Sequence, residues 1–304
     1  MSRGWAVIIN PQSRAGSTKK KIATIKRILE LNKIAFSLYK TQSAGDELNV
    51  VKRVVKEGFK KIICVGGDGT LQKIIAGIQL QKTCSPKEII VAIIPLGTGN
   101  DWAKSIEIPL SIEKAIEKIK QGKTKKRDLG VVLINKKKKI KKRYFVNYSG
   151  VGFDAFMLNK LQPYKWLGKY AYLVCSIANF WFYKNSLVSV RGNKFNLSKK
   201  VFLCGVGVSK YTGGGMQIIK NPKGNNGLLN LTVAYSFTKI DIIKNFFNLF
   251  NGSIFNDRKV LTMLDDEIKI SSKNDVLTCQ GDGEIFGSGN LTFSVLKKQI
   301  THIC

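Results

Sequence analysis

Histidine is almost absent from this sequence: the 304 residues contain only one, His302, two positions before the end. A mechanism that needs a histidine base or histidine metal ligands is therefore not expected. A general base must be an aspartate, a glutamate or a lysine, and a bound cation is expected to have oxygen ligands. The six cysteines are scattered and form no Cys-x-x-Cys pair, which argues against a zinc site and indicates a reducing cytosol.

Long hydrophobic runs are also missing. The longest nearly apolar stretch, residues 170–183, is interrupted by Ser176 and Asn179, and it is shorter than the ~20 residues of a helix that spans a bilayer. A core helix or a segment at a membrane interface is expected there. The apolar run from Trp5 to Ile9 leads directly into Asn10-Pro11 and does not resemble a signal peptide, so we expect a cytoplasmic protein.

Acidic residues are scarce: the sequence contains 20 of them and 51 basic residues, which gives a formal net charge of +31. One interpretation is an anionic partner, such as a membrane surface or a nucleic acid. The other is a lysine-rich solvated surface without a specific partner. Dedicated nucleic-acid binders usually interleave aromatic residues with basic ones, and basic runs such as Lys136 to Lys139 have few aromatic neighbours. No dedicated nucleic-acid binding is therefore expected.

A glycine-rich turn stands between an expected strand and an expected helix. Ile62-Ile63-Cys64-Val65 is typical of a buried strand, and Gly66-Gly67-Asp68-Gly69-Thr70 follows it. A helix is indicated next, because apolar residues recur at the i, i+3, i+4, i+7 spacing. Its unpaired N–H groups and dipole favour an anion, and glycines let the backbone approach a phosphate. The alternative is a tight turn that only needs glycine. The apolar positions of the helix are Leu71, Ile74, Ile75 and Ile78.

The first 130 residues alternate between strand and helix patterns. This order predicts a doubly wound, mostly parallel sheet with helices on both faces. The loops after the four strands then share one edge, where open α/β sheets bind ligands. Strands are expected at residues 5–9, 34–38, 62–65 and 89–94, and helices at 22–29, 48–55, 71–78 and 112–119.

After about residue 130 strand-like runs dominate, and turns such as Asn225-Asn226-Gly227 separate them. We expect an α/β nucleotide-binding domain at 1–130 and a β-sandwich lipid-substrate domain at 131–304, with a cleft between them. The last strand could return to the first domain, and a helical insertion is expected near 155–183. Sandwich strands are expected at residues 131–134, 143–148, 187–190, 201–208, 228–234, 276–279 and 291–296.

Two further loops carry candidate chemistry. In Gly97-Thr98-Gly99-Asn100-Asp101, Thr98 and Asn100 could donate hydrogen bonds to phosphate oxygens, and Asp101 could cap a helix or help to hold a cation. Asp282 and Glu284 flank Gly283, and on an extended segment they would point the same way. Such a pair could provide a base and a metal-holding partner for phosphoryl transfer, or it could be a plain turn. The sequence has no P-loop motif, and no Gly-x-Gly-x-x-Gly follows the first strand.

These motifs resemble the catalytic domain of the diacylglycerol kinase and sphingosine kinase superfamily, and most of all the soluble bacterial lipid kinases. The resemblance covers essentially the whole chain. The Gly-Gly-Asp-Gly turn is shared with NAD kinases of related fold, whereas Gly-Thr-Gly-Asn-Asp favours lipid kinases. The matching stretches are Asn10-Pro11, Gly66 to Leu71, Pro95 to Asp101, Asn147 to Asp154, Gly213-Gly214-Gly215 and Asp282-Gly283-Glu284.

The resemblance implies ATP-dependent phosphorylation of a lipid hydroxyl, with Mg²⁺, in the interdomain cleft. Glu284 would occupy the proton-acceptor position with Asp282 beside it; either carboxylate could take the proton, and Glu284 ranks slightly first. ATP would be bound by Asn10, Pro11, Gln12, Ser13, Arg14, Thr41, Gly66, Gly67, Asp68, Gly69, Thr70, Leu71, Gln72, Thr98 and Asn100.

The sequence departs from the family pattern at two places. Gln72-Lys73 stands where the family has Asn-Glu, and Asn226 stands where the bacterial kinases have an aspartate. That aspartate would help to hold a structural Mg²⁺ together with acids that match Asp101 and Asp128. Asparagine is a neutral and weaker ligand for a hard cation, which puts the metal site in question.

The leading hypothesis is a cytoplasmic lipid kinase that associates peripherally with anionic membrane, with residues 170–183 as a candidate for acyl-chain or interface contact. An NAD kinase is one alternative. A nucleotide- or lipid-responsive regulator that has lost turnover is another, and the Lys73 and Asn226 departures motivate it. The identity of the lipid and the oligomeric state, a homodimer included, are left open by the sequence.

Overall fold

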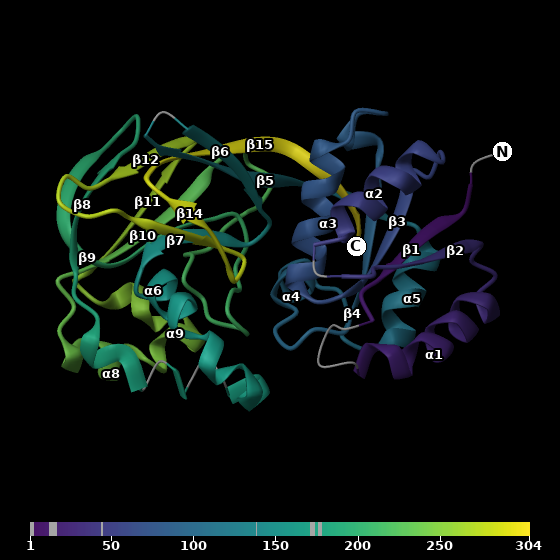
Figure 1. Cartoon of the computed structure of the whole chain (residues 1–304), viewed down its shortest axis with the longest axis horizontal. Helices are drawn as coiled ribbons and strands as arrows, with labels where there is room; N and C mark the ends of the chain where they lie inside the picture. The colour runs from purple at the N-terminus through teal and green to yellow at the C-terminus, as the bar shows by residue number, and fades with distance from the viewer. Residues whose placement is uncertain (1–2, 12–16, 44, 138, 171–173, 176–177) are drawn as a thin grey trace. The chain divides into compact units, whose positions relative to one another are not determined.

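The computed structural model describes residues 3–11, 17–43, 45–137, 139–170, 174–175 and 178–304. The chain forms two compact units: unit 1 comprises residues 1–129 with 297–304, and unit 2 comprises 130–296. The chain therefore passes from one unit to the other within strand β5 (Thr124–Lys136) and again within β15 (Asn290–Ile303) (Figure 1).

Unit 1 is built on a parallel sheet with the strand order β15-β4-β3-β1-β2. The end of the chain completes this sheet, because Thr301 and His302 of β15 pair with Ile90 and Val91 of β4. The elements are β1 (Trp5–Ile9), α1 (Ser17–Leu31), β2 (Phe36–Lys40), α2 (Glu47–Lys56), β3 (Lys61–Gly66), α3 (Asp68–Leu80), η2 (Pro86–Glu88), β4 (Ile90–Pro95), α4 (Asp101–Ser105) and α5 (Ile112–Gln121).

Helices cover both faces of this sheet, as Figure 1 shows. On one face Ile25 of α1 and Ile116 of α5 pack on Val7, Ile63 and Ile94 of the strands, and all five side chains are buried. The helices α2 and α3 lie against each other and bury their own apolar residues. The doubly wound parallel architecture predicted from the strand–helix alternation is thus confirmed.

The expected helices and strands of unit 1 are present, with shifts of a few residues at their ends. The second strand begins at Phe36 rather than at Ile34. Helix α5 ends at Gly122, whose φ of 69° suits glycine because a side chain is disfavoured there. The five-residue helix α4, which begins directly after Asn100, was not predicted.

Unit 2 is a β-sandwich-like domain, also as predicted. Its strands join in the order β14-β13-β7-β9-β8-β12-β15, with β10 and β11 added at β9 and the hairpin β5–β6. The strands are β6 (Lys139–Phe145), β7 (Tyr148–Gly152), β8 (Ser186–Arg191), β9 (Asn196–Gly207), β10 (Leu229–Tyr235), β11 (Val260–Asp265), β12 (Glu267–Ser271), β13 (Thr278–Gly281) and β14 (Glu284–Ser288).

The core of unit 2 is apolar and continuous. Val132, Phe145, Val206, Leu231 and Phe293, from five different strands, are fully or almost fully buried in one cluster. The single strand predicted for residues 143–148 is wrong, because β6 ends at Phe145 and β7 begins at Tyr148. Backbone N–H groups in this break donate to the carboxylate of Asp282.

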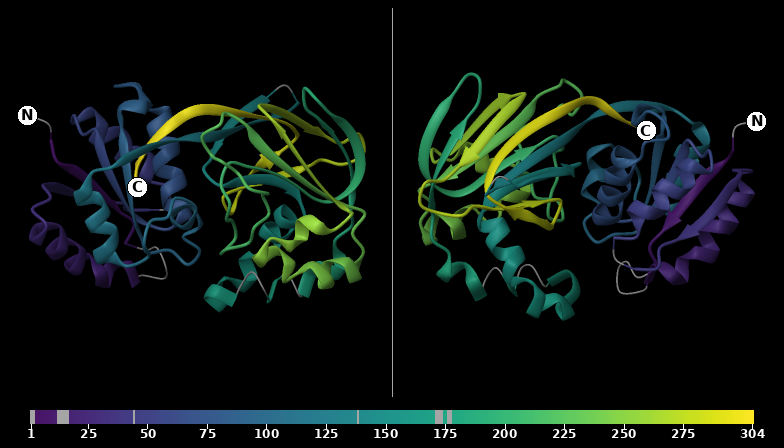
Figure 2. Two further views of the ribbon diagram at one scale, coloured as in Figure 1. Left: turned by 180° about the vertical axis from the view of Figure 1, so that it is seen from behind. Right: turned by 45° about the horizontal axis from the view of Figure 1, so that its top comes forward.

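The helices of unit 2 gather at one end of its strands, and both the front and the rear views show this grouping (Figures 1 and 2). None of the helices in the described part of the chain is long and apolar enough to cross a bilayer. These elements are α6 (Phe153–Lys160), η3 (Gln162–Tyr170), η4 (Phe180–Phe182), α8 (Lys239–Asn245), α9 (Asn248–Asn251) and η5 (Ser253–Asn256).

The single histidine allows the packing of unit 1 to be tested directly. His302 is buried beside Trp102, with ring centroids 5.4 Å apart, and burial lowers its pKa from 6.5 to about 4. The unfolded chain takes up a proton below pH 6.5, whereas the folded chain does so only near pH 4. The stabilisation by His302 is therefore complete above pH 6.5 and lost as the pH falls towards 4.

We expect the one imidazole C2–H resonance in a proton NMR titration to move near pH 4 in the folded protein. The same titration in concentrated urea serves as the control, and there the midpoint should be near 6.5. A folded-state midpoint at or above 6.5 would contradict the buried environment of this ring.

Candidate active site

The glycine-rich turn lies between β3 and α3, as predicted, and it touches the loop that follows β4. A Cβ added to Gly67 would lie 2.8 Å from the Cα of Gly97, and one added to Gly97 would lie 2.5 Å from the Cα of Gly67. The two loops can approach this closely only because both residues are glycines. At Gly69, by contrast, an added Cβ would meet no described atom within 4 Å apart from the adjacent residues and the backbone of its own helix.

Asp68 fastens these two loops together. Its Oδ2 accepts a hydrogen bond of 3.0 Å from the backbone N–H of Asp101, and its Oδ1 accepts one of 2.8 Å from that of Trp102. The carboxylate of Asp68 thus caps α4 from another loop, because the first N–H groups of a helix lack partners within it. The sequence analysis placed Asp68 among the residues that bind ATP, and this capping contact was not predicted.

Asn100 closes the second loop on itself. Its Oδ1 accepts from the N–H of Gly97 at 2.8 Å and its Nδ2 donates to the carbonyl of the same residue at 3.0 Å. Asn100 also adopts a left-handed backbone with φ 52°. Its side chain is therefore a brace of the loop, with one remaining N–H for a ligand. The neighbouring Thr98 is exposed.

The loops after β1 and β2 also meet. The N–H of Thr41 donates to the carbonyl of Ile9 at 3.0 Å, and Nδ2 of Asn10 donates to Oε1 of Glu47 at 3.0 Å. Glu47, at the start of α2, is buried and was missed by the sequence analysis, although an acidic residue next to a turn could have drawn attention. Burial raises the pKa of the Cys64 thiol, and the nearby charges of Glu47 and Asp68 add to this effect.

Unit 1 thus brings most of the predicted nucleotide-binding residues to the carboxyl edge of its sheet. Thr70, Leu71 and Gln72 lie in the first turns of α3 and are buried. Gln12, Ser13 and Arg14, which were assigned to the same site, lie outside the described residues. The arrangement fits a nucleotide phosphate, because Gly67 has no side chain to cap α3 and the space at Gly69 is open beside its first N–H groups.

Acidic oxygens for a cation are present at this edge as well. A Cβ added to Gly99 would lie 3.2 Å from Oδ2 of Asp101 and 3.3 Å from Oδ2 of Asp68, so both carboxylates lie beside one residue. Mg²⁺ typically takes one or two carboxylates together with phosphate oxygens and water. Among the described residues, no group of three or more His, Cys, Asp and Glu side chains is placed to hold a metal ion.

The other two residues of the predicted structural metal site have contacts of their own. Oδ1 of the buried Asp128 accepts a 2.7 Å bond from the N–H of Lys298. Oδ1 of the exposed Asn226 accepts a 3.3 Å bond from the N–H of Leu228, as an aspartate at this position would also do. The loop conformation therefore does not require the carboxylate that Asn226 replaces.

Asp282 and Glu284 belong to a hairpin rather than to an extended segment. Gly281 of β13 pairs with Glu284 of β14, and the two residues between them have positive φ, 48° at Asp282 and 83° at Gly283. Asp-Gly is the sequence that such a two-residue turn favours. The expectation that both carboxylates point the same way on an extended strand is therefore wrong.

The carboxylate of Asp282 accepts hydrogen bonds from three successive backbone N–H groups: Val146 at 2.7 Å, Asn147 at 3.0 Å and Tyr148 at 3.2 Å. These groups lie in the break between β6 and β7 that the sequence analysis did not predict. Glu284, by contrast, has an exposed side chain. Of the two candidate bases, Asp282 is thus used to hold the hairpin, and Glu284 is the one presented to solvent.

A cluster of buried polar side chains is hydrogen-bonded to the same hairpin. Oδ2 of Asp154 accepts from the hydroxyl of Tyr148 at 2.9 Å and from Nε2 of Gln280 at 2.6 Å. Oε1 of Gln280 in turn accepts from the N–H of Gly283 at 3.4 Å. Burial raises the pKa of Asp154, although these hydrogen bonds act in the opposite direction. The sequence offered one signal of this cluster, a glutamine directly after the end of an expected strand.

Comparisons with known proteins place both units in described families. Residues 4–132 match the family model described as the diacylglycerol kinase catalytic domain. Residues 147–304 match the one described as the YegS C-terminal NAD kinase beta sandwich-like domain.

Individual proteins show the same likeness. A diacylglycerol kinase of Staphylococcus carnosus is 32% identical over 50% of this chain, and the match covers 46% of that relative, so only about half of its length is spanned. A Serratia proteamaculans protein named "Probable lipid kinase YegS-like" is 28% identical over 74% of this chain and 70% of its own. A crystal structure of a diacylglycerol kinase from Bacillus anthracis has a TM-score of 0.72 at 22% identity and covers 99% of this chain and 96% of its own.

A pair of glycine substitutions separates packing from ligand approach. We expect Gly67→Ala to lower the free energy of unfolding by about 1–3 kcal/mol, because the new Cβ collides with the Gly97 backbone. Gly69→Ala should leave stability unchanged or raise it by up to about 1 kcal/mol, because the space is open and the backbone is helical.

Gly69→Ala should nevertheless weaken ATP binding, since its Cβ would fill the space assigned to a phosphate. Urea unfolding gives the stabilities, and calorimetric titration with ATP gives the affinities. Unchanged ATP affinity in Gly69→Ala would argue against phosphate at this turn.

The buried cluster can be tested with Asp154→Asn. The amide nitrogen of asparagine would replace either Oδ2, which accepts from Nε2 of Gln280, or Oδ1, which accepts from the N–H of Ala155, so a hydrogen bond is lost in either orientation. We expect a loss of about 1–3 kcal/mol in urea unfolding at pH 7. Asp275→Asn, at an exposed loop position, is the matched control and should be neutral.

The pH profile gives a second readout of the same substitution. Because the folded pKa of Asp154 lies above its value of 3.8 in the unfolded chain, its contribution to stability is largest below pH 3.8 and declines as the pH rises through the folded pKa. This decline should be absent in Asp154→Asn. A variant with wild-type stability and a wild-type pH profile would show that the cluster does not act as described.

Proposed function

We propose that this chain transfers the γ-phosphoryl group of ATP to the hydroxyl of a diacylglycerol-like lipid. The premise is its family: residues 147–304 belong to the YegS C-terminal domain family, and residues 4–132 match the diacylglycerol kinase catalytic domain. The observation that carries this proposal is the open first turn of α3, with its glycine N-cap and the free space at Gly69. The names of the relatives, which are diacylglycerol and lipid kinases, support a lipid acceptor.

In this proposal unit 1 binds ATP through backbone groups more than through side chains. The N–H groups at the start of α3 and the helix dipole would hold phosphate oxygens. Asp68 and Asn100 keep the two glycine loops in place for this purpose. Mg²⁺, held by the phosphates and by Asp68 or Asp101, would offset the negative charge of the phosphates and of these carboxylates.

Unit 2 would supply the proton acceptor. Glu284 is an exposed carboxylate at the first position of β14, directly after a turn that Asp282 and Gln280 fix by hydrogen bonds. A carboxylate can take the proton of an attacking hydroxyl, and general base catalysis of this kind typically contributes about 10²- to 10⁴-fold. The only histidine is buried at the end of β15, so it is not a competing base.

Replacement of the proposed base tests this assignment. We expect Glu284→Gln to lower the rate of phosphoryl transfer by about 100-fold or more, with little change in the KM for ATP, because unit 1 binds the nucleotide. Labelled ATP and short-chain diacylglycerol in detergent micelles provide the assay. Glu267→Gln, an exposed glutamate on β12, is the matched control and should retain full activity.

The choice of acceptor decides between the candidate functions. The protein is incubated with labelled ATP and with one acceptor at a time: diacylglycerol, phosphatidylglycerol, a sphingoid base, an undecaprenol-like alcohol or NAD. Labelled lipid supports the proposal, whereas labelled NAD with no labelled lipid would contradict it. ATP binding without transfer to any acceptor would indicate a regulator that has lost turnover. Full activity in Glu284→Gln would show that another group takes the proton.

A further inference from the structure

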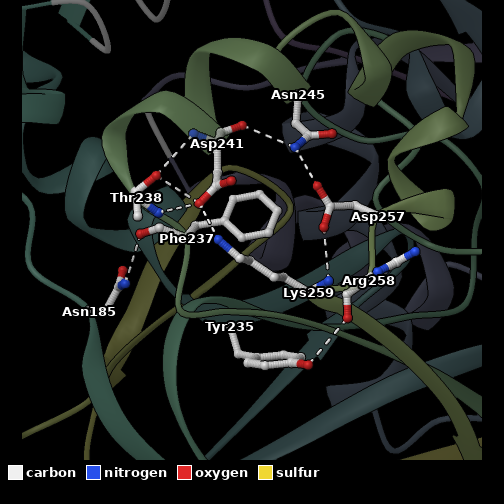
Figure 3. A network of polar contacts seen from close by, with 9 residues as sticks. All are labelled: Asn185, Tyr235, Phe237, Thr238, Asp241, Asn245, Asp257, Arg258 and Lys259. Atoms are coloured by element: carbon white, nitrogen blue, oxygen red, sulfur yellow. Dashed lines mark hydrogen bonds and ion pairs between the residues drawn. The ribbon is translucent and has the colours of Figure 1, made fainter.

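The helix α8 in unit 2 turns polar side chains inward. Its Thr238 cap accepts from the N–H of Asp241, and Oδ2 of Asp241 accepts from Nζ of Lys259 at 2.6 Å (Figure 3). The buried Asn245 donates to Oδ2 of Asp257 at 2.8 Å, and Oδ1 of Asp257 accepts from the N–H of Lys259 at 2.8 Å. The inward side of this short helix is thus fastened by hydrogen bonds as well as by apolar packing.

The outward side of α8 and α9 is apolar. Ile240 is 77% exposed, Ile243 62% and Phe247 76%, and Phe250 is exposed as well. These positions recur at helical spacing, so they share one side of the segment. Single exposed apolar residues are common, but a cluster of large ones usually marks a contact surface. We call these four residues the α8 face.

A second exposed group lies next to the α8 face. Trp181 and Phe182 of η4 are 63% and 73% exposed. Lys239, the first residue of α8, donates to the carbonyl of Phe180 and, at 3.0 Å, to that of Tyr183, and its ammonium lies 5.4 Å from the ring centroid of Phe180. The start of α8 is therefore bound directly to η4, and the two exposed groups form one region of unit 2.

Lysines outnumber acidic residues in the sequence segments that form this region. The sequence from Ala155 to Ser186 contains four lysines and no acidic residue. In the helical segment after Thr238, Asp241 is the one acidic residue up to Asn256, and hydrogen bonds from Lys259 and Thr238 lower its pKa to about 2. That negative charge is paired within the protein, whereas Lys244 on the same helix is exposed.

We propose that the α8 face, together with Trp181 and Phe182, is a docking surface that inserts into an anionic lipid bilayer. The polar network holds the helix so that Ile240, Ile243 and Phe247 point away from the unit. A helix whose apolar side enters the boundary between headgroups and acyl chains, with lysines at its edge, is a common interfacial anchor. The positive flanks favour anionic lipid over a neutral surface.

This inference extends the proposed function, because a kinase of long-chain lipids must reach a substrate that resides in a membrane. The inferred partner of the α8 face is a lipid surface rather than a second copy of the chain. An apolar patch with a rim of lysines on both copies would bring like charges together in a symmetric dimer, and this disfavours such an interface.

Vesicle binding tests the docking surface. The variant carries Ile240→Ser, Ile243→Ser and Phe247→Ser, and the matched control carries Ile140→Ser, Leu264→Ser and Val276→Ser, which are also exposed apolar positions of unit 2. We expect the affinity for phosphatidylglycerol-containing vesicles in sedimentation assays to fall by about tenfold or more in the variant and to change little in the control. Lys244→Glu should weaken binding as well, most strongly at low salt.

Insertion can be observed without any substitution. Trp181 of the docking surface is exposed, whereas Trp5 and Trp102 are buried, so lipids brominated on their acyl chains should quench the fluorescence of Trp181 and of neither buried tryptophan. The quenching should diminish in Trp181→Phe. Absence of quenching, or equal vesicle binding by the variant and the control, would overturn the proposal. A wild-type dimer in light scattering that dissociates on substitution of the α8 face would overturn it too.

Activity measurements keep this inference separate from the proposed function. The α8 variant should phosphorylate a water-soluble short-chain diacylglycerol at the wild-type rate and lose activity only on vesicles. If the wild type and the variant both phosphorylate neither substrate, the kinase assignment is contradicted. The vesicle-binding measurements would still test the docking surface in that case. Equal loss on both substrates in a folded variant would assign these residues to the site itself and overturn the docking role.

Discussion

In each unit an aspartate accepts hydrogen bonds from backbone N–H groups far away in the sequence, and it thereby holds the loops that carry candidate functional residues. In unit 1 Asp68 accepts from Asp101 and Trp102, and in unit 2 Asp282 accepts from three residues of the break between β6 and β7. Hydrogen bonds to a charged acceptor are stronger than those between neutral groups. Both aspartates sit in glycine-rich turns, so each fixes a backbone that would otherwise be among the most flexible of its unit.

Within each motif the aspartate holds the backbone, and different groups are left accessible to a ligand. The aspartate of Gly-Gly-Asp-Gly is engaged with α4, and the glycines around it leave N–H groups and open space for a ligand. The aspartate of Asp-Gly-Glu is engaged with the backbone near Val146, and Glu284 is left exposed. In both motifs the aspartate holds the backbone, whereas neighbouring groups, the N–H groups at the start of α3 and the carboxylate of Glu284, are proposed to bind the ATP phosphates and to take the proton of the lipid.

The sequence predicted the architecture well, because strand and helix periodicity is local. The runs around Ile62 and Ile90 gave buried parallel strands, and Gly122 marked a helix end. The contacts of the site were harder to predict, because they join residues far apart in the chain. Asp68 meets Trp102, and Asp282 meets Val146, across 34 and 136 positions. Helix α4 was missed for the same reason, since its cap comes from another loop.

Pattern reasoning also failed where a residue pair admits two backbone conformations. Asp282-Gly283 satisfies the alternation of a strand and equally the two-residue turn of a hairpin, and pairing of Gly281 with Glu284 selects the turn. Glu47 and Asp154 gave no periodic signal at all. They are buried acids whose partners, Asn10 and Gln280, are visible only in the folded chain.

The cluster of Tyr148, Asp154 and Gln280 is difficult to explain by stability alone. Burial of a carboxyl group is unfavourable even with hydrogen bonds, and its raised pKa expresses that cost. An apolar residue of similar size would fill the same volume with less penalty, but it would leave Gln280 without the partner that orients it. Gln280 then could not hold the N–H of Gly283, the residue before Glu284. Asp154 is therefore a positioning residue. Its burial is unfavourable for stability, but it restricts the conformation of the turn that carries Glu284, the proposed base.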